Sequence, residues 1–303
     1  MVIEFQPDSV AQELELDAYN DPCLKSALSC HFGFEQFNPG QFEIIRDVLS
    51  GKPTVAIMPT GAGKSLCYQL PAIILPGLTV VVSPLIAMMK DQVDALNSRG
   101  IHAAFINSTQ SIEIQNDILT GLTRTEVRLL YVAPERFRSS RFMRVLSACE
   151  ISLLAIDEAH CISRWGHDFR PDYGRLGHVI DELKPKHILA CTATATPEVR
   201  RDIEASLRLA DPCIHIAGFQ RDNLFLFVKR CRSEKQRSAE LLKAIDAVQS
   251  GGVIIYSATR KRVDQIHRML ADSALDLTIV AYHAGMDEQS RRMAQDKFMN
   301  GQA

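Results

Sequence analysis

The sequence lacks the features that mark membrane, secreted and zinc-binding proteins. No apolar run approaches the length of a membrane span, and the start has no basic region followed by an apolar core. The eight cysteines are scattered and include no C-x-x-C pair, which argues against a zinc site or a disulfide framework and favours reduced thiols. The net charge of −2 is not the global basic signature of a nucleic-acid-binding protein. We therefore expect an ordinary globular protein of the cytoplasm, with no membrane partner.

Composition sets few further limits. The 303 residues suffice for one large domain or two smaller ones, and 46% hydrophobic with 23% charged residues is ordinary for such a protein. Residues 1–22 hold six acidic and no basic residues, which predicts an acidic, loosely ordered lead segment. Residues 219–303 hold fourteen Lys or Arg against ten acids. That excess fits a groove along a phosphate backbone and a solvated surface equally well.

A phosphate-binding loop is present at residues 58–65, Met-Pro-Thr-Gly-Ala-Gly-Lys-Ser. An apolar, β-branched stretch precedes it and a helix-compatible stretch follows, so backbone N–H groups and a helix dipole would converge on phosphate oxygens. Lys64 would neutralise the β- and γ-phosphates, and the Ser65 hydroxyl would ligate magnesium. Met58 stands where the strict pattern has glycine, so Gly61 and Gly63 must supply the tight turn. The residues expected to bind ATP here are Thr60, Gly61, Ala62, Gly63, Lys64 and Ser65.

An acidic motif, Asp157-Glu158-Ala159-His160, follows the apolar stretch 153–156. Both carboxylates would then lie at the C-terminal end of a strand, the edge at which open α/β sheets bind ligands. Asp157 would hold the magnesium shell, and Glu158 would position and deprotonate the attacking water. A solvated acidic loop is the alternative. It explains one carboxylate well and two beside a phosphate loop poorly.

Apolar strands alternate with amphipathic helices from residue 23 to 217, which predicts a parallel sheet covered on both faces. The expected strands are 53–58, 79–83, 102–106, 128–133, 152–157, 187–192 and 213–217, and the expected helices are 40–50, 64–75, 84–99, 111–121, 137–149 and 196–208. A linker is expected near 210–222. A second series follows, with helices 234–249, 260–273 and 287–299 and strands 252–257 and 277–282. We expect a lead segment (1–22), an ATP-binding domain (23–217) and a partial second domain (218–303).

Seven motifs in family order resemble those of RecQ-type DNA helicases of superfamily 2. They are His31–Gln41 (HFGFEQFNPGQ), Ser83–Gln92 (SPLIAMMKDQ), Tyr131–Arg136 (YVAPER), Asp157–Pro171 (DEAHCISRWGHDFRP), Thr192–Ala195 (TATA), Phe219–Leu224 (FQRDNL) and Tyr282–Met286 (YHAGM). The resemblance implies a RecA-like P-loop domain followed by an incomplete second RecA-like α/β domain. It also implies ATP and magnesium as cofactors, with Lys64, Asp157, Glu158 and His160 in catalysis. The activity implied is 3′-to-5′ unwinding coupled to translocation on single-stranded DNA, in repair or recombination at the bacterial nucleoid.

The resemblance also assigns residues to the base and to DNA. Gln41 can pair bidentately with an adenine edge, and Phe34 or Phe37 could stack on the base, although core packing explains either ring as well. Asn38 stands where the family usually has arginine. DNA, single-stranded and as a forked duplex, is the implied partner.

The loop that follows the acidic motif is the implied DNA sensor. Trp165 and Phe169 offer stacking surfaces and Arg170 a phosphate clamp, with Trp165 as a core anchor the alternative. We expect His160 to relay between the carboxylates and the segment of Thr192 and Thr194.

The family's arginine finger belongs beyond residues 283–285, and no matching segment occurs before residue 303. Two interpretations stay open: a truncated record of an unwinding enzyme, or a nucleotide- and DNA-binding module without unwinding activity. A related RNA helicase or remodelling ATPase is a third. For the chain as written we expect ATP binding, weak or absent DNA-stimulated turnover and no processive unwinding.

Overall fold

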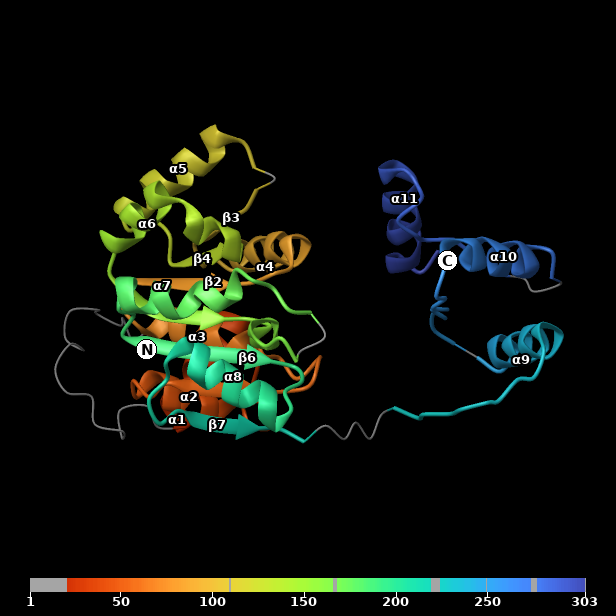
Figure 1. Ribbon diagram of the computed structural model, residues 1–303, viewed down its shortest axis with the longest axis horizontal. Coiled ribbons are helices and arrows are strands. Elements are labelled where there is room, and N and C mark those ends of the chain that lie inside the picture. The colour runs from red at the N-terminus through yellow and green to blue at the C-terminus, as the bar shows by residue number, and fades with distance from the viewer. Residues whose placement is uncertain are drawn as a thin grey trace. The chain divides into compact units, whose positions relative to one another are not determined.

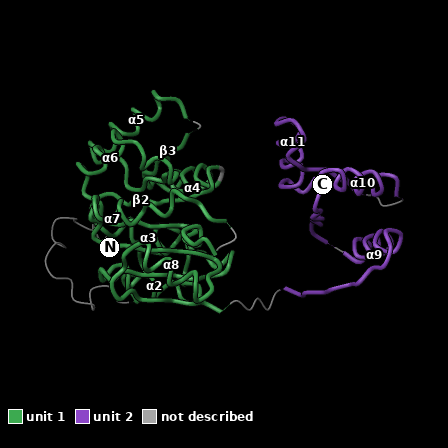
Figure 2. The backbone as a smooth tube through the Cα atoms, viewed as in Figure 1, with its two compact units in different colours: residues 1–221 green, residues 222–303 purple. Residues whose placement is uncertain are grey.

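A computed structural model describes residues 21–108, 110–165, 168–218, 224–248, 250–273 and 277–302. The chain forms two compact units, residues 1–221 and 222–303 (Figure 2). Most of the acidic lead segment lies outside the described residues, as do Gly166 and His167 of the loop expected to sense DNA, residues 219–222 of the expected linker and Asn223 after it.

A seven-stranded parallel sheet forms the centre of the first unit, in the order β3-β4-β2-β5-β6-β1-β7 (Figure 1). The strands are β1 (Thr54–Ile57), β2 (Leu78–Val82), β3 (Ala103–Ile106), β4 (Leu129–Val132), β5 (Ile151–Ile156), β6 (His187–Thr192) and β7 (Cys213–Ile216). All seven coincide with expected strands, so the prediction of a parallel α/β sheet is confirmed.

Helices cover both faces of this sheet, because alternate residues of each strand point to opposite sides. In β1, Ala56 packs into one apolar core and Val55 and Ile57 into the other. The first core is covered by α1 (Asp21–Phe32), α2 (Gln41–Leu49), α3 (Leu66–Ile74) and α4 (Ile86–Ser98). The second is covered by α5 (Ile112–Thr123), α6 (Ser140–Ser147), α7 (Leu176–Leu183) and α8 (Pro197–Leu207).

Local differences from the expected helices are few. Neither α1 nor α7 was expected, and the expected helix 137–149 is a 3-10 turn, η3 (Pro134–Arg138), followed by α6. Two further 3-10 turns, η4 (Ala159–Ile162) and η5 (Tyr173–Arg175), flank the loop after the acidic motif.

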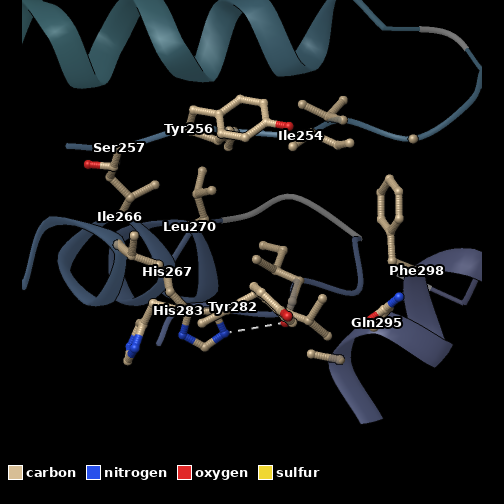
Figure 3. Close-up of a pocket in the computed structure, with 18 of the residues that line it drawn as sticks. Ile254, Tyr256, Ser257, Ile266, His267, Leu270, Tyr282, His283, Gln295 and Phe298 are labelled. Atoms are coloured by element: carbon tan, nitrogen blue, oxygen red, sulfur yellow. Dashed lines mark hydrogen bonds between the residues drawn. The ribbon is translucent and has the colours of Figure 1, made fainter. Parts of the chain in front are cut away.

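The second unit contains the three expected helices, α9 (Glu234–Asp246), α10 (Arg260–Ala271) and α11 (Glu288–Met299). The expectation of strands at 252–257 and 277–282 is wrong: neither segment forms a strand or makes a ladder with any described residue. A cavity of about 810 Å³ is lined by both segments, with Ile254 and Tyr256 on one and Tyr282 on the other (Figure 3). A strand needs a hydrogen-bonded neighbour, and these two segments have none among the described residues. Tyr256 is 90% exposed.

Candidate active site

Three sequence segments meet at one edge of the sheet. In the parallel register Ile57 of β1 pairs with Thr192 of β6, and Ile156 of β5 pairs with Ala190 of β6. The carboxyl ends of β1, β6 and β5 are therefore neighbours. Because the phosphate loop, the acidic motif and the threonine segment each follow one of these ends, they lie together where open α/β sheets bind ligands.

The phosphate loop turns at two glycines. Gly61 and Gly63 have φ angles of 84° and 79°, in the left-handed region that non-glycine residues avoid. The Met58 side chain is buried in the core under the loop, and its backbone N–H donates to the Thr192 carbonyl at 2.9 Å. Met58 is thus a core residue directly after β1, and the turn starts after it. The Lys64 ammonium donates to the Met58 carbonyl across the loop at 3.3 Å.

Asp157 is a partly buried carboxyl group with a raised pKa. Burial raises its pKa to about 6, and the Glu158 charge adds to the rise. A hydrogen bond from the Glu158 N–H (3.0 Å) and the positive charges of Lys64 and His160 act in the opposite direction. The Tyr173 hydroxyl donates to the Asp157 carbonyl at 2.9 Å. Asp157 and Lys64 therefore share one electrostatic site.

Glu158 and His160 are oriented by a strained backbone and a hydrogen-bond chain. Glu158 has a φ of 49°, an uncommon left-handed conformation for a residue with a side chain. Nδ1 of His160 lies 2.8 Å from Thr192 Oγ1 and 3.3 Å from Glu158 Oε2. The Thr192 hydroxyl donates to the Thr194 carbonyl at 3.1 Å, so it accepts from His160, and the imidazole carries a proton on Nδ1. The expected link from His160 to Thr192 and Thr194 is present in this geometry.

Gln41 is directed at the phosphate loop. Its Nε2 donates to the carbonyls of Ala62 (3.2 Å) and Gly63 (2.9 Å), and its Oε1 accepts from the Asn38 N–H at 2.8 Å. Both amide hydrogens are used, so this conformation leaves only an acceptor for an adenine edge rather than the bidentate pair expected from the sequence.

The two candidate stacking rings differ in exposure. Phe34 is 51% exposed, whereas Phe37 is partly buried and packs on Phe42 with 5.9 Å between ring centroids. Phe34 is therefore the ring that a base can reach.

The loop after the acidic motif exposes its aromatic side chains. Trp165 is 82% exposed, which rules out the core-anchor alternative. The Arg170 guanidinium donates to the Asp168 carboxylate and to the Pro84 carbonyl (3.1 Å), so it ties the loop to the segment before α4. The Arg170 guanidinium, which was expected to clamp a DNA phosphate, is therefore already hydrogen-bonded to groups of the protein itself.

Sequence reasoning missed two residues of this region. Arg164 is exposed and lies 5.7 Å from the centroid of the Phe169 ring, which puts a cation beside the loop aromatics. Tyr173 holds the Asp157 backbone from sixteen residues away. The position of Arg164 next to the single tryptophan was a usable signal, whereas nothing local marks Tyr173.

The donor set suits a magnesium ion bound together with phosphate. Within the described part of the chain, no three His, Cys, Asp or Glu side chains come together as ligands for a metal. One hydroxyl (Ser65) and one carboxylate (Asp157) are what Mg²⁺ takes when water and phosphate oxygens complete its shell. Among the described helices, none is both long enough and apolar enough to cross a bilayer.

The chain is similar to helicases in sequence and in fold. The profile of DEAD/DEAH box helicases matches residues 38–203, more than half of the chain. The ATP-dependent DNA helicase RecQ of Bacillus subtilis is 44% identical over 91% of this chain and 46% of its own length, and RecQ of Haemophilus influenzae is 40% identical over 91% and 44%. The probable ATP-dependent DNA helicase RecS of Bacillus subtilis is 38% identical over 92% and 56%.

The chain thus spans about half the length of these relatives. In fold it is similar to the helicase Lhr of Mycobacterium smegmatis, solved with ssDNA and AMP-PNP, with a TM-score of 0.65 at 17% identity over 95% of this chain and 41% of that one. With a RecA-like sheet that gathers the phosphate loop and the Asp-Glu-Ala-His motif at one edge, the chain belongs to the DEAD/DEAH box helicase family, and RecQ DNA helicases are among its relatives.

Proposed function

We propose that the chain is the ATP-driven motor portion of a RecQ-type DNA helicase, translocating 3′ to 5′ on single-stranded DNA. The observation that carries this proposal is the meeting of Lys64, Asp157 and the His160–Thr192 pair at one sheet edge. The 44% identity to a RecQ helicase supports DNA as the substrate.

In this proposal each site residue has one task. The N–H groups of the loop from Thr60 to Ser65 bind the phosphates, and Lys64 moves from the Met58 carbonyl to the β- and γ-phosphate oxygens. Magnesium, held by Ser65 and Asp157, would offset the charge of the phosphates. Glu158 orients the attacking water and accepts its proton.

His160 links the Glu158 carboxylate to Thr192. Its Nδ1–H is shared between Glu158 and Thr192, so a change at the Glu158 carboxylate alters the hydrogen bond to Thr192. Thr192 ends β6 and Thr194 lies in the segment after it, and we propose that ATP turnover is coupled to the second domain through this segment.

We propose a domain boundary between residues 217 and 218. Residues 23–217 are the ATP-binding domain, and residues 218–303 are part of a second RecA-like domain. The motor would act on forked DNA in repair or recombination, in the cytoplasm at the nucleoid.

Isothermal titration of the 303-residue chain with MgATP tests the nucleotide half of the proposal. We expect saturable 1:1 binding that Lys64→Ala weakens at least about tenfold, the value of one charge-assisted contact of about 1.4 kcal/mol or more. Glu158→Gln should keep binding while any ATP hydrolysis is lost. A chain that binds MgATP equally well with Lys64→Ala would contradict the assignment.

Because the chain has a single tryptophan, DNA binding at Trp165 can be measured directly by fluorescence. Stacking of a base on the exposed Trp165 ring should quench its fluorescence when a single-stranded DNA oligonucleotide is added, with weaker binding at higher salt. An RNA oligonucleotide of the same sequence should bind more weakly. Equal or stronger quenching by RNA would favour the related RNA helicase instead, and no quenching by either would remove Trp165 from the nucleic-acid interface.

A further inference from the structure

A cavity of about 310 Å³ borders the phosphate loop, at the lower end of the range for small-molecule sites. One wall is the connection between α1 and α2, with the exposed Phe34 ring. A second is the start of α3, with Ser65 and Gln69, and the third is the C-terminal half of α4, with Gln92 and Arg99. Any nucleoside attached to phosphates in the loop has this cavity beside it.

Arg99 lines this cavity, and its guanidinium contacts Phe32. The residue caps the C-terminal end of α4, and its guanidinium carbon lies 5.9 Å from the centroid of the Phe32 ring. One Nη1–H donates to the Phe32 carbonyl at 2.8 Å. A guanidinium has five N–H donors, and the others have no acceptor among the residues that the structure describes. Arg99 is thus oriented and still able to donate.

Two of the amides that line the cavity, those of Gln41 and Gln69, are already engaged as donors. Gln41 donates both Nε2 hydrogens to the carbonyls of Ala62 and Gly63. Nε2 of Gln69 donates to Gln92 Oε1 at 2.8 Å and to the Tyr131 hydroxyl at 3.0 Å. The ring nitrogens of a purine are acceptors, so they need a donor, and the amides of Gln41 and Gln69 do not offer one.

We infer that Arg99 binds the purine base of the nucleotide, donating to its ring nitrogens while the base lies in the cavity against Phe34. The inference rests on the proposed function, because it takes the phosphates to be held by the loop. A planar guanidinium suits this task better than an ammonium, since its fixed fork matches a flat acceptor edge and stacks on aromatic faces. Arg99 is therefore a base-binding residue that no motif of the sequence pointed to.

The test compares ligands with and without a base. Isothermal titration of the full chain with MgATP, MgADP and magnesium tripolyphosphate gives three dissociation constants for each variant. We expect Arg99→Gln to weaken MgATP and MgADP by about 5- to 20-fold, as loss of one charged contact implies, and to leave tripolyphosphate within about twofold. Arg99→Lys should stay weakened, because it keeps the charge and loses the fork. Arg201→Gln, at an exposed arginine of α8 paired with Glu198, is the matched control and should change none of the three.

The outcomes separate this inference from the function on which it rests. Equal weakening of all three ligands by Arg99→Gln, or unchanged binding of MgATP, would overturn the role of Arg99. If the wild-type chain binds MgATP no more tightly than magnesium tripolyphosphate, base binding in the cavity is overturned. Phosphate binding by the loop would still stand in that case. Wild-type chain that binds neither would overturn both. An unchanged melting temperature of the Arg99 variants shows that they are folded.

Discussion

At the scale of single residues, Asp157 combines a functional position with a cost to stability. Its pKa is about 6 in the fold against 3.8 for the free side chain, chiefly because of burial. A raised carboxyl pKa means that the folded state holds its proton more tightly than the unfolded state. The contribution of Asp157 to stability is therefore most favourable below pH 4 and declines as the pH rises to about 6. Above that pH the penalty is about 2–3 kcal/mol.

Asp157→Asn should therefore stabilise the ligand-free chain in a pH-dependent way. We expect its free energy of unfolding to exceed that of wild type by about 2–3 kcal/mol at pH 8, with the gain falling to about 1 kcal/mol at pH 4.5. Urea unfolding followed by circular dichroism at pH 4.5, 6 and 8 measures this. Asp94→Asn, at an exposed carboxylate on α4, is the control and should show no such trend. A gain of the same size at all three pH values would mean that the charge of Asp157 is not its cause.

At the scale of elements, α3 depends on a residue far away in the sequence. This helix follows the phosphate loop, contains Pro71 and has no basic residue in its last turn. Arg128, just before β4, donates to the carbonyls of Ala72 (3.0 Å), Ile73 (3.3 Å) and Leu75 (2.7 Å), and also to that of Gly77 (3.4 Å). A partly buried guanidinium thus satisfies carbonyls that a helix end otherwise leaves without donors.

Arg128→Met should lower the free energy of unfolding by about 2–4 kcal/mol, because several partly buried carbonyls lose a charged donor. Arg128→Lys should recover part of the loss, since an ammonium reaches fewer of these oxygens. Urea unfolding of both variants measures the effect. Arg124→Met, at an exposed arginine four residues earlier, is the comparison, and a loss as large there would show that any nearby arginine has the same effect.

Sequence patterns located the strands of the first unit better than its short helices. Apolar and β-branched residues make up most of every strand there, a local signal that can be read without knowing which segments pair. Helix α7 has eight residues, about two turns, too few for a helical period to stand out. Helix α1 did carry a signal, because its buried Leu24, Leu28 and Phe32 recur every four residues. The strands expected in the second unit were wrong for a different reason: an apolar segment becomes a strand only when another segment pairs with it.

At the scale of the whole molecule, the two units differ in how much apolar surface they bury. The first unit has two continuous cores on either side of its sheet. The connecting segment at 224–228 exposes its apolar side chains, with Phe225 at 89% and Val228 at 91%. Open, extended segments that bury little are the preferred sites of protease attack.

Limited trypsin digestion should therefore cut first after Lys229, Arg230 or Arg232, which follow this segment. We expect a fragment containing the first unit to persist while the second unit is degraded. Mass spectrometry of timed samples identifies both. A second-unit fragment that survives as long as the first would contradict the difference in burial.

The sequence by itself determined the local features of the protein. These are the buried strands, the left-handed turn at Gly61 and Gly63, and the two carboxylates after β5, because apolar runs and glycine conformations act within a few residues. It also carried the expectation that the phosphate loop and the acidic motif share an edge.

Only the tertiary structure decided which groups are engaged and which are available. Parallel pairing inserts β6 between β5 and β1 and so brings Thr192 to His160, 32 residues away. Packing across the first core turns Gln41 onto the loop and sets Arg99 at the cavity. Such choices depend on contacts between distant segments, and no local pattern encodes which donor finds which acceptor.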